Sequence, residues 1–190
     1  TPVNDAPLAI DGSHSGAEDI LLDVSLTGTD IDGTVASVSV ATPPANGTLL
    51  LRDTLAPVAV GALLTPAQAA TLVFRPNPNW NGSTSFTFTV TDNEGAASAP
   101  ATVQLQITPV NDPPLAVNDS SSTVAQAPVT VAVLGNDSDA DNDPLTVTNA
   151  TVSAALGNVV VNGDGSLTFT AAPGVTGPVV ISYSISDGNG

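Results

Sequence analysis

The chain lacks cysteine and methionine altogether, and it has only two basic residues, Arg52 and Arg75, among its 190 residues. Without cysteine it can form neither a disulfide framework nor a thiolate metal site. The missing initiator Met leads us to expect a processed protein or an internal piece of a longer one. With 18 acidic residues and a formal charge of −16, the chain is not expected to bind nucleic acid or an anionic membrane surface.

Long apolar runs and catalytic constellations are also missing. The sequence has no apolar run of 18 residues, so we expect no insertion into a membrane, and it shows no N-terminal signal peptide. His14 is the only histidine, and no Ser-His-Asp arrangement gathers around it. Without further His or Cys residues a catalytic zinc site is excluded, and we expect the protein not to be an enzyme.

What the sequence does contain is strand-like alternation. Small polar and apolar residues alternate in 85–91 (SFTFTVT), 102–107 (TVQLQI), 166–170 (SLTFT) and 181–185 (ISYSI). A period of two places the apolar side chains on one face of a half-buried strand. Only residues 65–71 (TPAQAAT) could form a helical turn. The sequence therefore predicts an all-β fold.

The chain is a tandem repeat. It reads TPVNDAPLAI at 1–10 and TPVNDPPLAV at 108–117, an offset of 107 that also places Asp30 on Asp137 and Asp32 on Asp139. Further along the offset falls to 95, so the second copy is 12 residues shorter, and we expect the extra residues in 53–66. Units of about 100 residues have the size of an immunoglobulin-like sandwich. We expect one repeat in residues 1–112 and the other in 113–190.

The first repeat is predicted to have seven strands, at residues 7–11, 20–26, 35–41, 47–51, 69–74, 83–90 and 101–108. Sixteen residues follow Asp92 up to Thr108, but only three follow the equivalent Asp187. We therefore expect two tandem seven-stranded Greek-key sandwiches of the cadherin or immunoglobulin type, the second lacking its last strand. Three explanations stay open: the chain boundary cuts a longer array, another chain supplies the missing strand, or the second domain is frayed at its end.

Acidic residues should converge at the ends of these sandwiches, because loops distant in sequence meet there. In the first repeat the incoming segment and two loops carry Asn4, Asp5, Asp30, Asp32 and Asp92. The corresponding set in the second repeat is Asn111, Asp112, Asp137, Asp139 and Asp187, and the exit end of the first repeat carries Glu18 and Asp19. Converging carboxylates repel unless a cation neutralises them, and an irregular set of oxygen ligands suits calcium better than magnesium. A single Asp can equally serve turn chemistry, and Asp164 in NGDGS is interpreted in that way.

The segments PVNDAP and PVNDPP resemble the interdomain calcium linker of cadherins. Together with TDIDGT, NPNWNGSTSFTFTVTDNEG and NDSDADNDPLTV, they make the chain similar to the cadherin-like tandem repeats of large bacterial surface proteins, including RTX-type adhesins. The resemblance implies that the calcium ligands at the junction are Asn111, Asp112, Asp137, Asp139 and Asp187, and that Glu18 is the acidic residue contributed by the preceding domain. Ala125 stands at the position of Glu18 in the second repeat, which implies weaker or different calcium binding at a following junction.

The function that this resemblance implies is structural. Calcium would stiffen the linkers of an extension module at the bacterial cell surface, with neighbouring repeats, extracellular polysaccharide or other cells as partners. Two alternatives stay open: a polysaccharide-binding module and a strand-exchanging subunit of an extracellular filament. The only support for sugar binding is Trp80 in NPNWNG, and a tryptophan there can instead plug the end of the sandwich.

Overall fold

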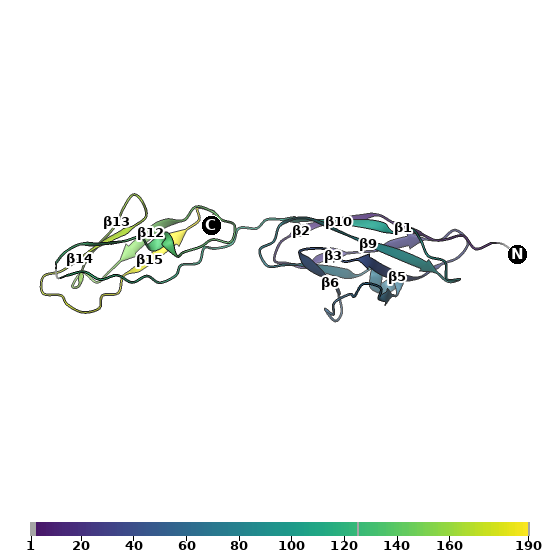
Figure 1. Ribbon diagram of the computed structural model, residues 1–190, viewed down its shortest axis with the longest axis horizontal. Coiled ribbons are helices and arrows are strands. Elements are labelled where there is room, and N and C mark those ends of the chain that lie inside the picture. The colour runs from purple at the N-terminus through teal and green to yellow at the C-terminus, as the bar shows by residue number, and fades with distance from the viewer. Residues whose placement is uncertain (1–2, 125, 190) are drawn as a thin grey trace. The chain divides into compact units, whose positions relative to one another are not determined.

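A computed structural model describes residues 3–124 and 126–189 of the chain, and the fold is all-β. The chain divides into two compact units, Thr1–Val110 (unit 1) and Asn111–Gly190 (unit 2), whose strands are labelled in Figure 1. None of the helices in the described ranges is long and apolar enough to cross a membrane.

Unit 1 contains two main sheets and a small two-stranded one. The larger main sheet has the order β2-β10-β9-β5-β7, the smaller has the order β3-β8-β6, and β1 pairs with β4. The strand bounds are β1 Leu8–Ile10, β2 Gly12–Ala17, β3 Leu22–Val24, β4 Thr27–Thr29, β5 Val35–Thr42, β6 Gly47–Leu51, β7 Leu63–Leu64, β8 Leu72–Pro76, β9 Gly82–Asp92 and β10 Ala101–Thr108.

Strand β10 is central to the core of unit 1. It pairs antiparallel with β9 and parallel with β2, and Figure 1 shows it beside both. Its alternate residues Ala101, Val103, Leu105 and Ile107 are all buried in the same cluster as Phe74 of the other main sheet. The alternating apolar side chains predicted from the sequence therefore pack between the inner faces of the two main sheets.

Unit 2 has fewer paired strands. One sheet has the order β11-β14-β13, and a second consists of β12 and β15. The bounds are β11 Val129–Val131, the short 3₁₀ helix η1 Val133–Gly135, β12 Thr146–Thr151, β13 Gly157–Val161, β14 Leu167–Ala171 and β15 Ser182–Ser186. Val133, Leu167 and Phe169 are the buried apolar residues among its described part.

The strands predicted at 47–51 and 101–108 are confirmed with the same bounds, and the helical turn expected within 65–71 is α1, Pro66–Ala69. Thr65 caps this helix. Because the helix occupies residues up to Ala69, the strand that was expected to begin at residue 69 begins at Leu72. The described part of unit 1 has ten strands where seven were expected, because β2, β4 and β7 escaped prediction. β2 reads Gly-Ser-His-Ser-Gly-Ala and β4 reads Thr-Gly-Thr, both without a large apolar residue, and β7 is only two residues long.

Gly47 allows β6 to pass close to the aromatic core. A Cβ atom at this position would lie 2.3 Å from Phe74 Cζ and 2.6 Å from the carbonyl oxygen of Arg75. We expect Gly47→Ala to lower the free energy of unfolding of unit 1 by about 1–3 kcal/mol through overpacking. Urea denaturation measures this change.

The matched control is Gly12→Ala in β2, where the added Cβ would come no closer than 3.7 Å to His14 or Val103. We expect this variant to be as stable as the natural chain or slightly more stable, because alanine loses less backbone entropy in a strand. Equal losses in the two variants would contradict the packing argument.

Candidate metal site

Acidic and amide side chains gather at one end of unit 2, where we define the unit 2 rim as Asn111, Asp112, Asp139, Asp141, Asp143, Asp187 and Asn189. Two hydrogen bonds hold the incoming chain to this rim. Asn111 Nδ2 donates to Asp187 Oδ2 at 2.7 Å, and the backbone N–H of Asp112 donates to Asp141 Oδ2 at 2.8 Å. Asp187 directly follows β15 and is only 8% exposed, so its carboxylate is fixed by burial as well as by hydrogen bonds.

The densest part of this rim is the loop that precedes β12. Each of Asp139, Asp141 and Asp143 offers a carboxylate oxygen, and these oxygens lie within 4.8 Å of one another. Asp139 Oδ1 accepts the backbone N–H groups of Asp141 and Asp143, which curls the loop around that carboxylate. Its other oxygen, Oδ2, is shielded from solvent and has no hydrogen-bond partner among the described residues.

Unit 1 repeats the same construction, and we define the unit 1 rim as Asn4, Asp5, Asp30, Asp32, Asp92 and Asn93. Asn4 Nδ2 donates to Asp92 Oδ2 at 2.8 Å, and the backbone N–H of Asp5 donates to Asp32 Oδ2 at 3.1 Å. Asp92 ends β9 and is 3% exposed. The predicted convergence of the incoming segment with two loops is therefore present in each unit.

Within the unit 1 rim, Asp30 stands out because both of its carboxylate oxygens are shielded and have no hydrogen-bond partner in the described ranges. A Cβ at Gly33 would lie 2.5 Å from Asp30 Oδ2 and 2.6 Å from Asn93 Oδ1. Because Gly33 has no side chain, the space beside Asp30 Oδ2 and Asn93 Oδ1 stays open. Asn93 Oδ1 is itself fixed by the N–H of Thr34 at 2.7 Å.

The structure corrects the register of the acidic loops by two residues. The bridge Leu115↔Ser138 in unit 2 corresponds to Leu8↔Thr29 in unit 1. Asp30 therefore corresponds to Asp139 and not to Asp137, and the offset of 107 expected for this loop is wrong.

Asp137 corresponds to Gly28 of unit 1, and its side chain contacts Val117 and Tyr183 of unit 2. Its Oδ1 accepts the N–H of Val117 at 2.7 Å and the hydroxyl of Tyr183 at 3.2 Å. Burial, followed by the charges of Asp137 and Asp119, raises the pKa of Tyr183, so the phenol stays protonated and continues to donate. The structure thus places Asp137 in a hydrogen-bonded pair and not in the unit 2 rim.

Glu18 and Asp19 lie beyond β2 in unit 1 and have different surroundings. Glu18 is 2% exposed, and its Oε1 accepts the N–H of Val110 at 2.8 Å, while Oε2 is buried without a hydrogen-bond partner among the described residues. Asp19 is exposed, and its Oδ1 accepts the N–H of Asn79 at 3.0 Å, so it supports the loop before Trp80. Ala125, the predicted counterpart of Glu18, lies outside the described residues.

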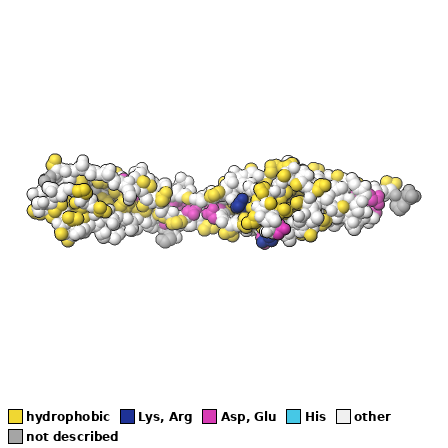
Figure 2. All heavy atoms as spheres, turned by 90° about the horizontal axis from the view of Figure 1, so that it is seen from below, with side chains coloured by type: hydrophobic (Ala, Val, Ile, Leu, Met, Phe, Trp, Pro, Cys, Tyr) yellow, Lys and Arg dark blue, Asp and Glu magenta, His cyan; other side chains and the backbone are white. Residues whose placement is uncertain are grey.

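The electrostatics of the unit 1 rim favour the ionised form of Asp92. The hydrogen bond from Asn4 lowers the pKa of Asp92 most strongly; burial opposes it, and the N–H groups of Ala96, Glu94 and Gly95 lower it further. Figure 2 shows that the acidic side chains on the face in view gather in small clusters and are not spread evenly. Each rim therefore concentrates negative charge and hard oxygen ligands, the donor set that calcium prefers.

Three rim residues were missing from the sequence prediction, Asp141, Asp143 and Asn93, whereas Asn189 was expected to converge on this end of unit 2. Asn189 Nδ2 donates to Asp143 Oδ2, and its N–H donates to Asp187 Oδ1. The dense run DSDADND was the available signal for Asp141 and Asp143, but the two-residue register error drew attention to the wrong members of that run.

Trp80, considered for sugar binding, and His14, the only histidine, both make contacts within unit 1. Trp80 is half-buried and packs against the core cluster of unit 1, which favours its interpretation as a plug of the sandwich end. His14 lies in β2, and its Nε2 accepts the N–H of Ser25 at 3.4 Å.

Comparison with known families and structures gives the following similarities. The family model of the bacterial cadherin-like domain matches residues 4–109, and that of the bacterial Ig domain matches residues 111–190. No curated protein matches the chain significantly.

Among solved structures, Drosophila N-cadherin EC1-4 is 12% identical, with 96% of this chain and 48% of that chain covered and a TM-score of 0.45. The SrpA adhesin R347E mutant from Streptococcus sanguinis is 14% identical, with coverage of 90% and 95% and a TM-score of 0.35. The chain spans 50%, 27% and 37% of the first three solved structures that it matches.

The hydrogen bond between Asn4 and Asp92 can be tested through its effect on the pKa of Asp92. Because the pKa of Asp92 is lowered from 3.8, its ionised form stabilises the fold above that pH, and this contribution is lost as the pH falls through the lowered pKa. We expect Asn4→Ala to move the pKa of Asp92 upward toward 3.8, so that the variant loses less stability than the natural chain as the pH falls below 3.8. Carboxyl NMR titration in calcium-free buffer measures the shift.

Asn158→Ala, at an exposed position of β13, is the control and should leave the pKa of Asp92 unchanged. An unchanged pKa in Asn4→Ala would show that the backbone N–H groups alone lower it.

Proposed function

Because this chain belongs to the bacterial cadherin-like domain family, we propose that it is a structural extension module of a bacterial surface adhesin whose acidic rims bind calcium. Domains of both matched families are typical non-catalytic modules of extracellular surface proteins. The proposal includes two Greek-key sandwiches in tandem, neighbouring repeats of the same polypeptide as partners, and other cells or extracellular polysaccharide as the target of the whole adhesin.

The observation that carries the calcium proposal is a set of shielded carboxylate oxygens without hydrogen-bond partners among the described residues: Glu18 Oε2, both oxygens of Asp30, and Asp139 Oδ2. A buried ionised oxygen with no partner costs several kcal/mol unless a cation or a proton compensates it. Three separate places in the chain show this feature, and each lies where the sequence places further carboxylates. A cation bound at each of these three places would compensate the oxygens found there.

The ligand set favours calcium over other metals. The rims offer carboxylates, Asn side-chain oxygens and backbone carbonyls, which are hard ligands, and the chain contains no Cys and one His. Calcium accepts six to eight such ligands in irregular geometry, whereas magnesium requires a near-ideal octahedron. Loops that converge from three parts of the sequence suit an irregular arrangement better.

Calcium would also restrict the segment that joins the two units. In unit 1 Glu18 accepts the N–H of Val110, and in unit 2 Asn111 and Asp112 are hydrogen-bonded to rim carboxylates. Cations bound separately to Glu18 in unit 1 and to the rim carboxylates of unit 2 would tighten the hold on residues 110–112. Pro109, Pro113 and Pro114 flank these residues and fix their own φ angles, so little free backbone would be left.

Calcium should stabilise the chain, and rim variants should reduce that effect. At a concentration of 100 times Kd, a ligand that binds only the folded state adds about 2.7 kcal/mol to the free energy of unfolding. We expect a higher Tm in calcium than in chelator, a smaller rise with magnesium, and a rise reduced by Asp141→Asn. Calorimetric titration should show calcium binding to that variant weakened by about tenfold.

Asp53→Asn is the matched control, because it removes an equal charge from an exposed turn outside both rims. Glu18→Gln gives a second readout. It keeps an oxygen for Val110 but removes a buried charge, so we expect unchanged or higher stability in chelator and a smaller gain in calcium. If calcium and chelator give the same Tm for the natural chain, the proposal is wrong.

Stiffening is tested separately from binding. We expect calcium to raise the ¹⁵N order parameters of Val110, Asn111 and Asp112, because their anchoring groups become metal ligands. The amide of Gly163, in the turn between β13 and β14, serves as an internal control and should not change. Calcium binding without any change at residues 110–112 would support a metal site but contradict the extension function.

A further inference from the structure

Four exposed loops of the chain carry the motif Asn-X-Ser or Asn-X-Thr, in which X is not proline. They read NGT at 46–48, NGS at 81–83, NDS at 118–120 and NDS at 136–138. This motif is the acceptor sequence for N-linked sugars: the asparagine amide takes the sugar, and the hydroxyl group two residues later is part of what the transferase recognises. A motif this short identifies a site only where both side chains are exposed on a loop.

The two motifs of unit 1 lie where β6 and β9 begin. Asn46 is an exposed turn residue with a left-handed backbone (φ 57°), and Asn81 is exposed immediately before β9. Thr48 and Ser83, which supply the hydroxyl groups, are exposed as well. Within the described ranges, neither asparagine side chain makes a hydrogen bond. Both amides are therefore accessible to an enzyme without any opening of the fold.

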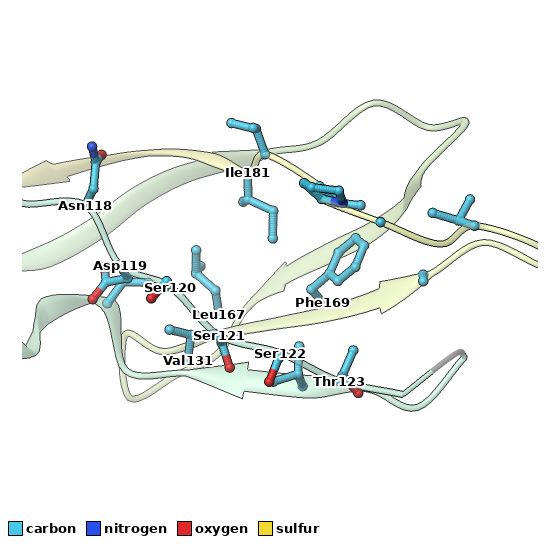
Figure 3. Close-up of a pocket in the computed structure, with 18 of the residues that line it drawn as sticks. Asn118, Asp119, Ser120, Ser121, Ser122, Thr123, Val131, Leu167, Phe169 and Ile181 are labelled. Atoms are coloured by element: carbon cyan, nitrogen blue, oxygen red, sulfur yellow. The ribbon is translucent and has the colours of Figure 1, made fainter.

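The two motifs of unit 2 lie side by side. Asn136, which follows η1, donates from Nδ2 to the backbone carbonyl of Asn118 at 3.3 Å. Both asparagines are exposed, and so are Ser120 and Ser138, which supply the hydroxyl groups. Figure 3 shows Asn118 and Ser120 beside an apolar groove of unit 2, with the amide of Asn118 directed away from Leu167. Because a side-chain amide has two N–H hydrogens, Asn136 can keep its bond to Asn118 after one of them is replaced.

The asparagines that hold the loops together lie outside these motifs. Asn4, Asn111 and Asn189 donate to rim aspartates. Asn162 donates to two hydroxyl groups of its own hairpin. The amides that stabilise the fold and the amides that a transferase could modify are thus different residues.

A fifth motif, NAT at 149–151, lies in a strand and not in a loop. Asn149 belongs to β12, and its backbone is paired with that of Ser184 in β15. A transferase has to draw the acceptor segment into its own site, which strand pairing opposes and a loop permits. Asn149 is therefore not expected to accept a sugar.

We propose that the asparagines of the four loop motifs accept an N-linked hexose from a nucleoside-diphosphate hexose, through a transferase: Asn46, Asn81, Asn118 and Asn136. The asparagine Nδ2 attacks the anomeric carbon of the hexose, and a C–N bond forms. The bond from that carbon to the diphosphate oxygen breaks, the nucleoside diphosphate leaves with the bonding electrons, and the amide gives one proton to a base of the transferase. None of the four asparagines belongs to a rim, so the modification does not depend on the proposed calcium binding.

The first test is the mass of the protein isolated from the bacterium that encodes it. We expect the mass to exceed that of the polypeptide by whole hexose residues, and peptide mapping should place them on the four loop asparagines. The chain has no Lys and two Arg, so cleavage beside aspartate is used. Asp53 separates Asn46 from Asn81, and the bond before Asp119 separates Asn118 from Asn136.

The segment NPNWNGS contains its own control. Asn77 and Asn79 are exposed like Asn81, but neither has Ser or Thr two residues later. We expect hexose on Asn81 and none on these two neighbours, because the three differ in the motif and not in exposure.

Substitution of the hydroxyl residue separates recognition of the motif from damage to the fold. We expect Ser138→Ala to abolish the hexose on Asn136 and to leave that on Asn118 unchanged. Ser138→Thr should keep both, because threonine retains the hydroxyl group. The side chain of Ser138 is exposed, so both variants should fold.

The purified 190-residue chain gives a second measurement on the folded protein. Incubation with a bacterial asparagine N-glycosyltransferase and UDP-glucose should add glucose to the four loop asparagines and not to Asn149. An unmodified mass in the native isolate would overturn the proposal. Labelling of Asn77, Asn79 and Asn149 to the same extent as the loop motifs would also overturn it, because neither the hydroxyl group nor the loop would then select the site.

Discussion

One hydrogen bond organises each acidic rim: the bond from the asparagine of the PVND segment to the buried aspartate at the end of β9 or just after β15. It joins Asn4 to Asp92 and Asn111 to Asp187. Burying a carboxylate is unfavourable unless hydrogen bonds compensate it, so each aspartate fixes the position of the chain that enters its unit. With the asparagine held, the next residue, an aspartate, donates its N–H to the acidic loop. The incoming segment and two loops are thereby brought together before any cation is considered.

The carboxylates brought together in this way repel one another, and the few basic residues of the chain do not neutralise them. Only Arg52 and Arg75 are available, and the ion pair found in the described ranges joins Arg52 to Asp23, away from both rims. Hydrogen bonds from N–H groups satisfy some rim oxygens but do not cancel the repulsion between carboxylates a few ångströms apart. A cation from solution, or a proton, would relieve this repulsion. This repulsion, more than the number of acids, makes a cation the physically reasonable partner.

The sequence predicted these features to unequal extents. Strict alternation located β9, β10, β14 and β15 because a half-buried strand leaves a period of two, and the PVND repeat located both rims. The register of the acidic loop failed, since matching identical residues aligned Asp137 with Asp30, although the β-bridges align Asp139 with it. A run of four aspartates offers several equally good alignments, and only strand pairing, which depends on residues far away, chooses among them. The shielding of Glu18 Oε2 likewise depends on tertiary packing that no local pattern encodes.

The difference between the two units shows that rim and core are separable. The rim is built from loops at one end of the strands, so it needs the ends of β9 or β15 but not the strand beside them. The core of unit 1, by contrast, depends on β10, which covers Phe74, while the equivalent Phe169 in unit 2 lines an open groove. A cation bound at the unit 2 rim would therefore fix the loops at that end without requiring any change in the core. Because the cation would bind only the folded state, it would raise the stability of unit 2.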